Sequence, residues 1–435
     1  DGSTVGQGSC ALAAHGGGVA LNSVALEPSA RYLLEIGQIS TKEGVIPSGW
    51  TFSTLSDCSN TSSGTTPARA LASRYFSGGT IPWVKTLDLN NSIIYGTDEC
   101  VTKAALQETS LRLYPAGTVL VAMYGGYVQI GRTGLLPFPA TVNQALTAIQ
   151  PDKEKLDSRY LLFVLNYRVE HWKSVASSSR KDPNITGADV RGFPIALPPP
   201  EEQRAIATAL SDADALIAGL ERLISKNRDI KQAAMQQLLT GETRLPGVSG
   251  TWVAKRMGDL CELSMGRTPP RLNQAMWGSG QVWLSIADLT SKVVSHSKEQ
   301  ITALAAASMH VIPRGTLLMS FKLSIGRLCF AGCDLYTNEA ICAFKSLKAD
   351  AEFMYYALQR IDFALHGKQA VKGYTLNRES LSQIAVRLPE QPEQTAIATV
   401  LSDMDAELSA LEARLTKTRA IKQGMMQELL TGRTR

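Results

Sequence analysis

The sequence predicts a mixed α/β (α+β) fold built twice, as two modules with mixed β-sheet cores that are each followed by a long helix. A stretch of 48 residues at 197–244 recurs at 388–435 with 28 identical positions, which is far too many for chance. The segments that precede the two copies, 48–196 and 249–387, align more loosely through short shared motifs. A period of this length indicates two whole modules rather than a solenoid of short units. We therefore expect a function that needs two of something.

Length and composition agree with two ordinary domains. The chain has 435 residues, of which 44% are hydrophobic and 19% charged, and no apolar run approaches the roughly 20 residues that span a bilayer. Its seven cysteines are odd in number and contain no CxxC pair, so the pattern favours neither a disulfide framework nor a zinc site. We expect a protein of the cytoplasm with reduced thiols, with no membrane and no metal in this chain.

The net charge of +5 is unevenly distributed. Each 48-residue copy carries six basic and seven acidic residues, which leaves 32 basic and 25 acidic residues for the rest of the chain. The excess positive charge therefore lies outside the repeats. It fits a polyanionic partner, although a moderate excess is also common for solubility alone.

The motifs divide the chain into five segments. We expect an N-terminal segment of unassigned role at 1–47, a first module at 48–196, a first helical repeat at 197–244, a second module at 245–387 and a second helical repeat at 388–435.

Both repeats show the apolar spacing of one long helical stripe. Prolines 198–200 precede the first stripe, and a Thr-Gly pair closes each copy, as is typical of helix ends. Ser211 with Asp214 resembles a capping box, so a short helix followed by a longer one is an alternative to one continuous helix. From residue 211 to 239 a continuous helix would be roughly 43 Å long.

The two stripes are predicted to pair with each other, because neither module offers enough helix to cover its own stripe. Asn227 and Thr418 interrupt the stripes at the same heptad, either as buried polar residues that fix the register or as solvated edges of the seam. The residues predicted for this coiled coil and for partner binding are Leu216, Leu220, Leu223, Asn227 and Ile230 in the first copy, and Leu408, Leu411, Leu415, Thr418 and Ile421 in the second.

The modules share a frame of short motifs. A Gly-x-Thr-Pro loop occurs at 64–67 and 266–269, a Trp-x4-Asp-Leu motif begins at Trp83 and Trp283, and an Asn-Gln/Glu-Ala turn occurs at 143–145 and 338–340. Apolar runs that begin at residues 118 and 316 predict buried strands, and residues 160–167 and 353–359 predict short helices. We expect Trp83 and Trp283 to be core residues rather than stacking platforms.

Catalytic motifs are lacking in the sequence. It contains no GxxxxGK[ST] loop, no HExxH and no GxSxG, and its five histidines do not recur between the modules. A duplicated protein without a duplicated active site is predicted to be a binding protein and not an enzyme.

The order module, helix, module, helix resembles the specificity subunit of type I restriction-modification systems, over about residues 48 to 435. The resemblance rests on the start of each repeat and on the Gly-x-Thr-Pro and Trp-x4-Asp-Leu frame. The matching positions at the repeats are Leu197, Pro198, Glu202, Gln203, Ile206 and Asp214, with Leu388, Pro389, Glu393, Gln394, Ile397 and Asp405. The segment 1–47 has no place in this pattern.

The resemblance implies that each module is a target-recognition domain for one half of a bipartite, asymmetric double-stranded DNA sequence. It implies that the helices form an antiparallel coiled coil, which sets the gap between the halves, and dock two modification (methyltransferase) subunits. Restriction (motor-nuclease) subunits would join them. S-adenosylmethionine, ATP and Mg would then be cofactors of the partner subunits, with none in this chain. Adenine-N6 methylation and ATP-dependent cleavage would belong to the assembled complex.

Residues for DNA contact are expected on module loops, as Arg and Lys for phosphates and as polar or aromatic side chains for bases. In the first module these are Thr65, Lys85, Tyr124, Gln129, Arg132, Arg180, Lys181 and Asn184, and in the second Arg267, Lys322, Arg327, Lys372, Tyr374 and Thr375. The alternative to a DNA-specificity role is a coiled-coil scaffold that organises protein partners and does not bind DNA. Salt-insensitive partner binding without affinity for duplex would indicate the scaffold.

Overall fold

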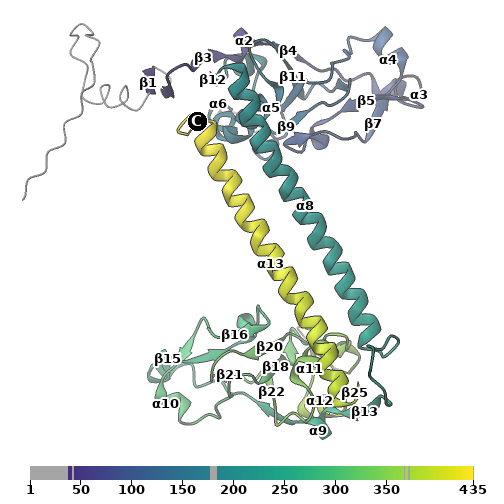
Figure 1. The fold of residues 1–435 in the computed structure, drawn as a ribbon, viewed down its shortest axis with the longest axis vertical. Coiled ribbons are helices and arrows are strands. Elements are labelled where there is room, and N and C mark those ends of the chain that lie inside the picture. The colour runs from purple at the N-terminus through teal and green to yellow at the C-terminus, as the bar shows by residue number, and fades with distance from the viewer. Residues whose placement is uncertain (1–37, 42–43, 177–183, 367, 371–372, 435) are drawn as a thin grey trace, which may run out of the picture. The chain divides into compact units, whose positions relative to one another are not determined.

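The computed structural model describes residues 38–41, 44–176, 184–366, 368–370 and 373–434 (Figure 1). The chain divides into two compact units. Unit 1 comprises Asp1–Ala215 and Arg419–Arg435, and unit 2 comprises Leu216–Thr418. Each unit therefore combines one module with segments of both repeats.

Unit 1 is built on a five-stranded mixed sheet and a smaller three-stranded sheet. The large sheet has the order β4 (Ser59–Ser63), β11 (Leu146–Pro151), β8 (Val119–Ala122), β9 (Thr133–Leu135) and β6 (Ser92–Ile93). The small sheet has the order β10 (Thr141–Val142), β5 (Ile81–Val84) and β7 (Glu99–Val101). Two further strand pairs are β3 (Thr51–Thr54) with β12 (Pro194–Leu197), and β1 (Gln38–Thr41) with β2 (Gly44–Pro47). The helices of the module are α2 (Leu55–Cys58), α3 (Ala72–Tyr75), α4 (Lys103–Glu108), α5 (Ser158–Tyr167), α6 (Val169–Val175) and α7 (Gly187–Arg191).

Unit 2 repeats the five-stranded sheet, the three-stranded sheet and one strand pair of unit 1. Its large sheet has the order β14 (Glu262–Met265), β22 (Ile341–Lys345), β18 (Leu317–Ser320), β20 (Leu328–Ala331) and β16 (Val293–Val294), and its small sheet the order β17 (Gln300–Ile301), β15 (Trp277–Leu284) and β21 (Tyr336–Thr337). The strand pair is β13 (Val253–Arg256) with β25 (Ala385–Leu388), and the module's helices are α9 (Met257–Leu260), α10 (Ala303–Ala306), α11 (Ala351–Gln359) and α12 (Arg378–Gln383). A third sheet of β19 (Lys322–Leu323), β24 (Gly373–Thr375) and β23 (Lys368–Ala370) has no counterpart in the described part of unit 1.

The predicted strands and short helices of the modules are confirmed. All four residues of β8 are fully buried, because β8 lies in the middle of the large sheet between β11 and β9. Its counterpart β18 holds the same place in unit 2. Helices α5 and α11 begin at capping carboxylates, Asp157 and Asp350, which accept hydrogen bonds from backbone N–H groups of the first turn. Both modules are thus built on a central antiparallel ladder with one helix on the sheet.

Each repeat forms one continuous helix of 39 residues, α8 (Pro200–Leu238) and α13 (Gln391–Leu429). The alternative of a short helix before a longer one is wrong. Ser211 lies inside α8, and its hydroxyl donates to the carbonyl of Ala207 in the preceding turn instead of capping a helix start. Beyond the helix ends, Gly241 and Gly432 adopt positive φ angles of 76° and 69°, as glycines that follow a helix often do.

A glutamine near the start of each helix joins it to its module. In unit 1 the Gln203 side chain accepts a hydrogen bond from the backbone N–H of Asp157 (2.9 Å) and donates to the carbonyl oxygens of Lys155 and Pro198 (both 2.8 Å). In unit 2 Gln394 accepts from the N–H of Asp350 (2.8 Å). Gln203 is fully buried and Gln394 nearly so, so these amides fix the helix at the capped start of α5 or α11.

The two helices run antiparallel within each unit. In unit 2, Asn227 donates to Glu407 (2.9 Å), while Lys231, one turn later in α8, pairs with Asp405 earlier in α13. In unit 1 the equivalent pair, Lys422 with Asp214, recurs with the roles of the helices exchanged. The same repeat residues therefore make the same ion pair twice.

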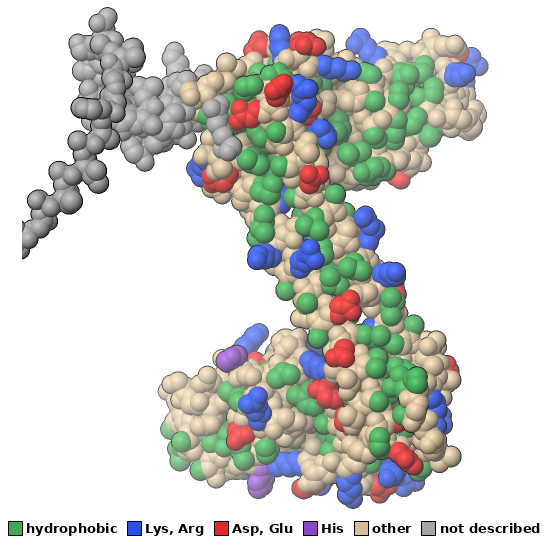
Figure 2. Space-filling model, in the orientation of Figure 1, with side chains coloured by type: hydrophobic (Ala, Val, Ile, Leu, Met, Phe, Trp, Pro, Cys, Tyr) green, Lys and Arg blue, Asp and Glu red, His purple; other side chains and the backbone are tan. Residues whose placement is uncertain are grey.

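The helix–helix seam differs from the predicted stripe. Leu220, Leu408 and Thr418 are buried, and Asn227, Leu411 and Leu415 are partly buried. Four residues predicted for the seam are exposed instead, by 41–52%: Leu216, Leu223, Ile230 and Ile421. Their placement in the coiled-coil seam is wrong. Each lies three residues after a predicted seam position (213, 220, 227 or 418), whereas the helices pack through the residues four positions after, Ile217, Ile224, Lys231 and Lys422, which are buried or partly buried. Figure 2 shows hydrophobic side chains reaching the surface along the helical part of the chain.

The seam predicts a contrast between two leucines of α8. Leu220→Ala is expected to destabilise the chain by about 2–4 kcal/mol because it empties a buried site, whereas Leu223→Ala should change stability by less than about 0.5 kcal/mol. Leucine and alanine have similar helix propensities, so the two variants are matched. Urea unfolding followed by far-UV circular dichroism measures the difference. Equal midpoints for both variants would contradict the seam.

Candidate nucleic-acid interface

Three loops meet at one edge of each module: the Gly-x-Thr-Pro loop, the Asn-Gln/Glu-Ala turn and the loop that follows β8 or β18. In unit 1 the Thr66 hydroxyl donates to the Gln144 side chain, and the N–H of Met123 donates to the carbonyl of Ala145 (2.8 Å). In unit 2 Thr268 donates to Glu339, and the N–H of Phe321 donates to the carbonyl of Ala340 (3.0 Å). We call this arrangement the loop edge. The shared frame of the sequence therefore builds the same edge twice.

Backbone packing explains the glycine of the Gly-x-Thr-Pro loop. A Cβ at Gly64 would lie well under 3.0 Å from the carbonyl oxygens of Val142 and Asn143, and one at Gly266 would lie equally close to the carbonyl of Thr337. A backbone oxygen cannot move aside as a flexible side chain can. Only glycine fits at this approach.

The repeated tryptophans donate hydrogen bonds to the backbone of the Gly-x-Thr-Pro loop. The indole N–H of Trp83 donates to the carbonyl of Thr65 (3.2 Å), and that of Trp283 donates to the carbonyl of Arg267 (3.0 Å). Both rings are almost completely buried, so their prediction as core residues is confirmed. The tryptophans hold the loop by a hydrogen bond and are not platforms for bases.

A pair of equivalent arginines, Arg69 and Arg271, was not predicted. The Arg69 guanidinium lies 4.3 Å from the ring centre of Phe76 and forms an ion pair with Glu99 (2.7 Å). Arg271 lies 4.1 Å from the ring centre of Trp277 and pairs with Glu299 (2.6 Å). Each follows the loop glycine by five residues, so the alignment of the modules contained a signal that could have found them.

Lys85 pairs with the same carboxylate as Arg69, that of Glu99. Its ammonium lies 2.9 Å from Glu99 and 4.0 Å from Asp98. Hydrogen bonds from Arg69 and then from Lys85 lower the pKa of Glu99 to about 2. Glu99 is therefore ionised at neutral pH and offsets these two cations. The contact of Lys85 with DNA stays a prediction. The charge of this lysine is already partly balanced by the two carboxylates.

Three of the other predicted residues of module 1, Tyr124, Gln129 and Arg132, lie on the loop after β8. Tyr124 is exposed, and Gln129 accepts a hydrogen bond from the Arg132 guanidinium (2.8 Å), which also donates to the carbonyl of Leu89. Thr65 is half-buried on the Gly-x-Thr-Pro loop, and Asn184 is half-buried. Arg180 and Lys181 lie outside the described residues.

Two arginines without a partner among the described residues lie at the loop edge of module 2. Arg267 and Arg327 are exposed, and within the described part of the chain neither guanidinium has a hydrogen-bond or ion-pair partner. Lys322 lies in β19, where its backbone pairs with that of Thr375, and the backbone of Leu323 pairs with that of Tyr374. The Thr268 hydrogen bond, with smaller contributions from Lys322 and Arg271, lowers the pKa of Glu339. Lys372 lies outside the described residues.

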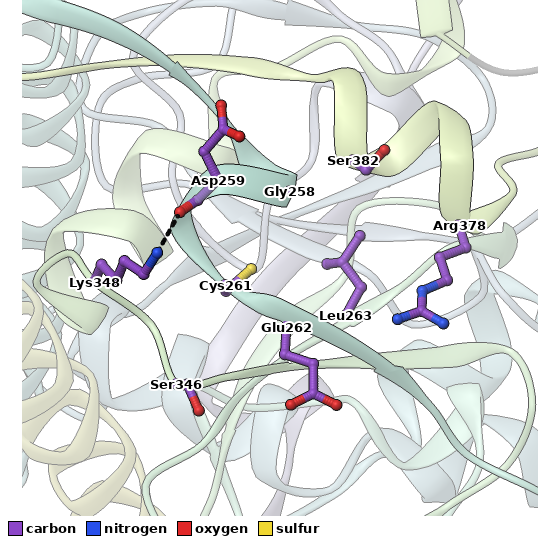
Figure 3. Close-up of a pocket in the computed structure, with 9 residues that line it drawn as sticks. All are labelled: Gly258, Asp259, Cys261, Glu262, Leu263, Ser346, Lys348, Arg378 and Ser382. Carbon is purple, nitrogen blue, oxygen red and sulfur yellow. Dashed lines mark hydrogen bonds between the residues drawn. The ribbon is translucent and has the colours of Figure 1, made fainter.

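A surface pocket of about 510 Å³ in unit 2 lies at the other end of β14 from this edge. Figure 3 shows its lining from α9, β14 and α12, with the Lys348 ammonium donating to the carbonyl of Asp259 (3.1 Å). Asp259 and Glu262 balance Lys348 and Arg378. This pocket therefore offers no excess charge for a phosphate backbone.

Among the described residues no three His, Cys, Asp or Glu side chains are grouped so that they could hold a metal ion. No helix in the described ranges is long and apolar enough to cross a membrane.

Solved structures share this architecture. A chain of a type I R-M system, studied for its complex assembly and conformational transition, has a TM-score of 0.56 at 17% identity and covers 89% of this chain and 99% of its own length. The HsdS subunit of Thermoanaerobacter tengcongensis has a TM-score of 0.50 at 20% identity, covering 89% and 98%. The fold of two mixed-sheet domains with two long helices is thus confirmed.

Sequence comparisons give the family. The putative type I restriction enzyme MjaX specificity subunit of Methanocaldococcus jannaschii is 25% identical over 67% of this chain and 71% of its own length. The MjaVIII specificity subunit of the same organism is 22% identical, covering 71% and 76%. The family model described as the type I restriction modification DNA specificity domain matches twice, at residues 47–227 and 249–422. The chain belongs to the type I restriction-modification DNA specificity family.

Proposed function

We propose that this specificity subunit reads a bipartite, asymmetric DNA sequence, with one half assigned to the loop edge of each module. The proposal rests on one observation. Both modules build the same hydrogen-bonded loop edge, but the side chains that the loop edge presents differ. Module 1 presents Tyr124 and Thr65, and module 2 presents Arg267, Lys322 and Arg327. Two half-sites of different sequence require two readers of different chemistry on a common frame.

The long helices have a different role in the proposal. Their similar sequences form the same ion pair in both units, Lys231 with Asp405 and Lys422 with Asp214, as expected of parts that position the modules and do not read bases. They would set the gap between the half-sites. The exposed residues Leu216, Leu223 and Ile230 follow one face of α8 at seven-residue spacing and offer an apolar stripe on which a modification subunit could dock.

Catalysis is assigned to partner subunits. Two modification subunits would bind S-adenosylmethionine and methylate adenine, and restriction subunits would use ATP and Mg to cleave unmodified DNA. The specificity chain itself would remain non-catalytic. Because its target would be chromosomal and invading DNA, the subunit would act in the cytoplasm.

Salt-dependent binding tests the proposal against a scaffold without DNA affinity. The full chain, co-purified with its modification subunits, is expected to bind its target duplex with an affinity that falls steeply as salt rises, because phosphate contacts release counterions. Affinity that does not change with salt, or no affinity for duplex, would favour the scaffold.

Arg267 and Arg327 provide a specific prediction. The double substitution Arg267→Ala with Arg327→Ala should reduce the slope of log affinity against log salt by about two, because each arginine is expected to neutralise one phosphate. Arg314→Ala is a suitable control, since this arginine is exposed in the turn before β18, at the opposite end of that strand from the loop that follows it. A slope unchanged in the double variant would remove both arginines from the interface.

A further inference from the structure

The loop after β8 exposes an apolar tip on a firmly held base. Tyr124, Tyr127 and Val128 are 41%, 51% and 84% exposed, three large apolar side chains within five residues. Only Tyr124 was predicted as a contact residue. Single exposed apolar residues are ordinary on protein surfaces, but a cluster at a loop tip marks a surface that binds.

The base of this loop is held on both sides. Gly125 and Gly126 have positive φ angles of 110° and 75°, and the carbonyl of Gly126 accepts the N–H groups of both Gln129 and Ile130 (3.0 Å each). The N–H of Gly131 returns to the carbonyl of Ala122 at the end of β8 (3.0 Å). The tip is therefore a closed turn on the central strand.

Side chains complete the support. Ile130 is buried in the module core, and a Cβ at Gly131, whose φ is 78°, would strike the buried Trp172 ring. The Arg132 guanidinium spans the carbonyl of Leu89 and the side chain of Gln129. A tip held this rigidly loses little conformational entropy when it binds, which favours affinity.

Module 2 has the same base with a different tip. Gly326, with φ of 84°, takes the place of Gly131 and returns its N–H to the carbonyl of Ser320 (2.9 Å), next to the Phe363 ring. The loop is shorter, its Phe321 is buried, and it carries Lys322 instead of exposed tyrosines. The two modules thus hold chemically different tips at equivalent places.

Building on the proposed function, we propose that Tyr127 and Val128 form an apolar probe that reads thymine methyl groups in the half-site of module 1. The C5-methyl of thymine is the apolar feature that the major groove presents, and uncharged side chains contact it directly. The tip bears no charge of its own, so it suits base edges and not phosphates. Its hydroxyl groups can donate to neighbouring acceptors on the DNA without changing the salt dependence of binding.

The test removes the methyl groups from the DNA. Methylation mapping first defines the two halves, and the half lost in Gly64→Ala belongs to module 1. Each thymine of that half is then replaced by deoxyuridine in a synthetic duplex, and binding by the full chain with its modification subunits is measured. At one thymine or more, the unsubstituted protein should lose affinity by about four-fold per methyl group.

Coupling between protein and DNA identifies the contact. Val128→Ala or Tyr127→Ala should weaken binding to the thymine duplex by a similar factor, show no further loss with deoxyuridine, and leave the salt slope unchanged. Leu113→Ala is the matched control, because Leu113 is half-exposed in the same module but precedes β8 instead of following it. Lys322→Ala should lower the salt slope and leave the response to deoxyuridine in this half intact.

Several results would overturn the probe. One is a half-site of module 1 that contains no thymine, and another is an affinity that deoxyuridine leaves unchanged at every position. Affinity losses from deoxyuridine and from the variants that simply add would show that the two do not contact each other. The last is a set of variants that assemble poorly with the modification subunits and yet discriminate DNA normally. The proposed function fails in a different way, because the unsubstituted complex would then show no two-part site at all.

Discussion

Gly64→Ala is expected to abolish reading of one half of the DNA site while the other half is still read, and Gly266→Ala is expected to do the reverse. A Cβ at either position would lie well under 3.0 Å from a backbone carbonyl of the neighbouring turn, so the whole loop must move. Such overpacking costs about 1–3 kcal/mol or more. It would displace the loop edge that Thr66 or Thr268 holds in place.

Methylation mapping of both variants measures the loss, and hydrogen exchange shows whether the damage stays within one module. Gly96→Ala is the matched control in module 1, since a Cβ there meets nothing within 4 Å. Simultaneous loss of both halves in either variant would show that the modules are not independent readers. Unchanged recognition would show that the loop edge does not face the DNA.

Four residues inserted after Asn227 are expected to lengthen the gap in the recognised sequence and to leave both halves unchanged. The insertion adds about one helical turn, or about 6 Å, to α8, which corresponds to at most about two base pairs. Asn227 and the neighbouring Arg228 contact α13 through Glu407 and Glu412, so the pairing must shift by one turn. Methylation at the original sites should be lost, because their gap no longer fits.

The same insertion beside Thr418 in α13 should act alike. Four residues placed after Gly247, in the connection that follows α8, provide the control and should not alter the gap, because this loop lies outside both helices. An insertion in α8 that altered the half-sites themselves, or left the gap unchanged, would show that the helices do not set the spacing.

The sequence predicted the elements that depend on local pattern. The repeats predicted two long helices, but the continuous helix expected over 211–239 is shorter than α8, which has 39 residues, as has α13. The apolar runs predicted β8 and β18, and the two repeated tryptophans were recognised as core residues. The predicted seam is wrong by one position, since the sequence pattern favours Leu223 and the structure buries Ile224. The packing angle of two antiparallel helices decides which face is covered. A single-helix pattern does not contain that angle.

The candidate site was predicted less completely, for a similar reason. Tyr124, Gln129 and Arg132 lie together on one loop as expected, but the exposure of Tyr127 and Val128 depends on a base held by a ring 41 residues further on. Arg69 and Arg271 could have been found, since they align after the loop glycine. Their ion pairs with Glu99 and Glu299 join segments that are distant in sequence and could not.

Methylation mapping of host DNA by single-molecule sequencing tests the central claim most directly. If each module reads its own half, the modified adenines will lie in one motif of two different short sequences separated by a gap of fixed length. A contiguous palindromic motif, or modification without a second half, would contradict the account.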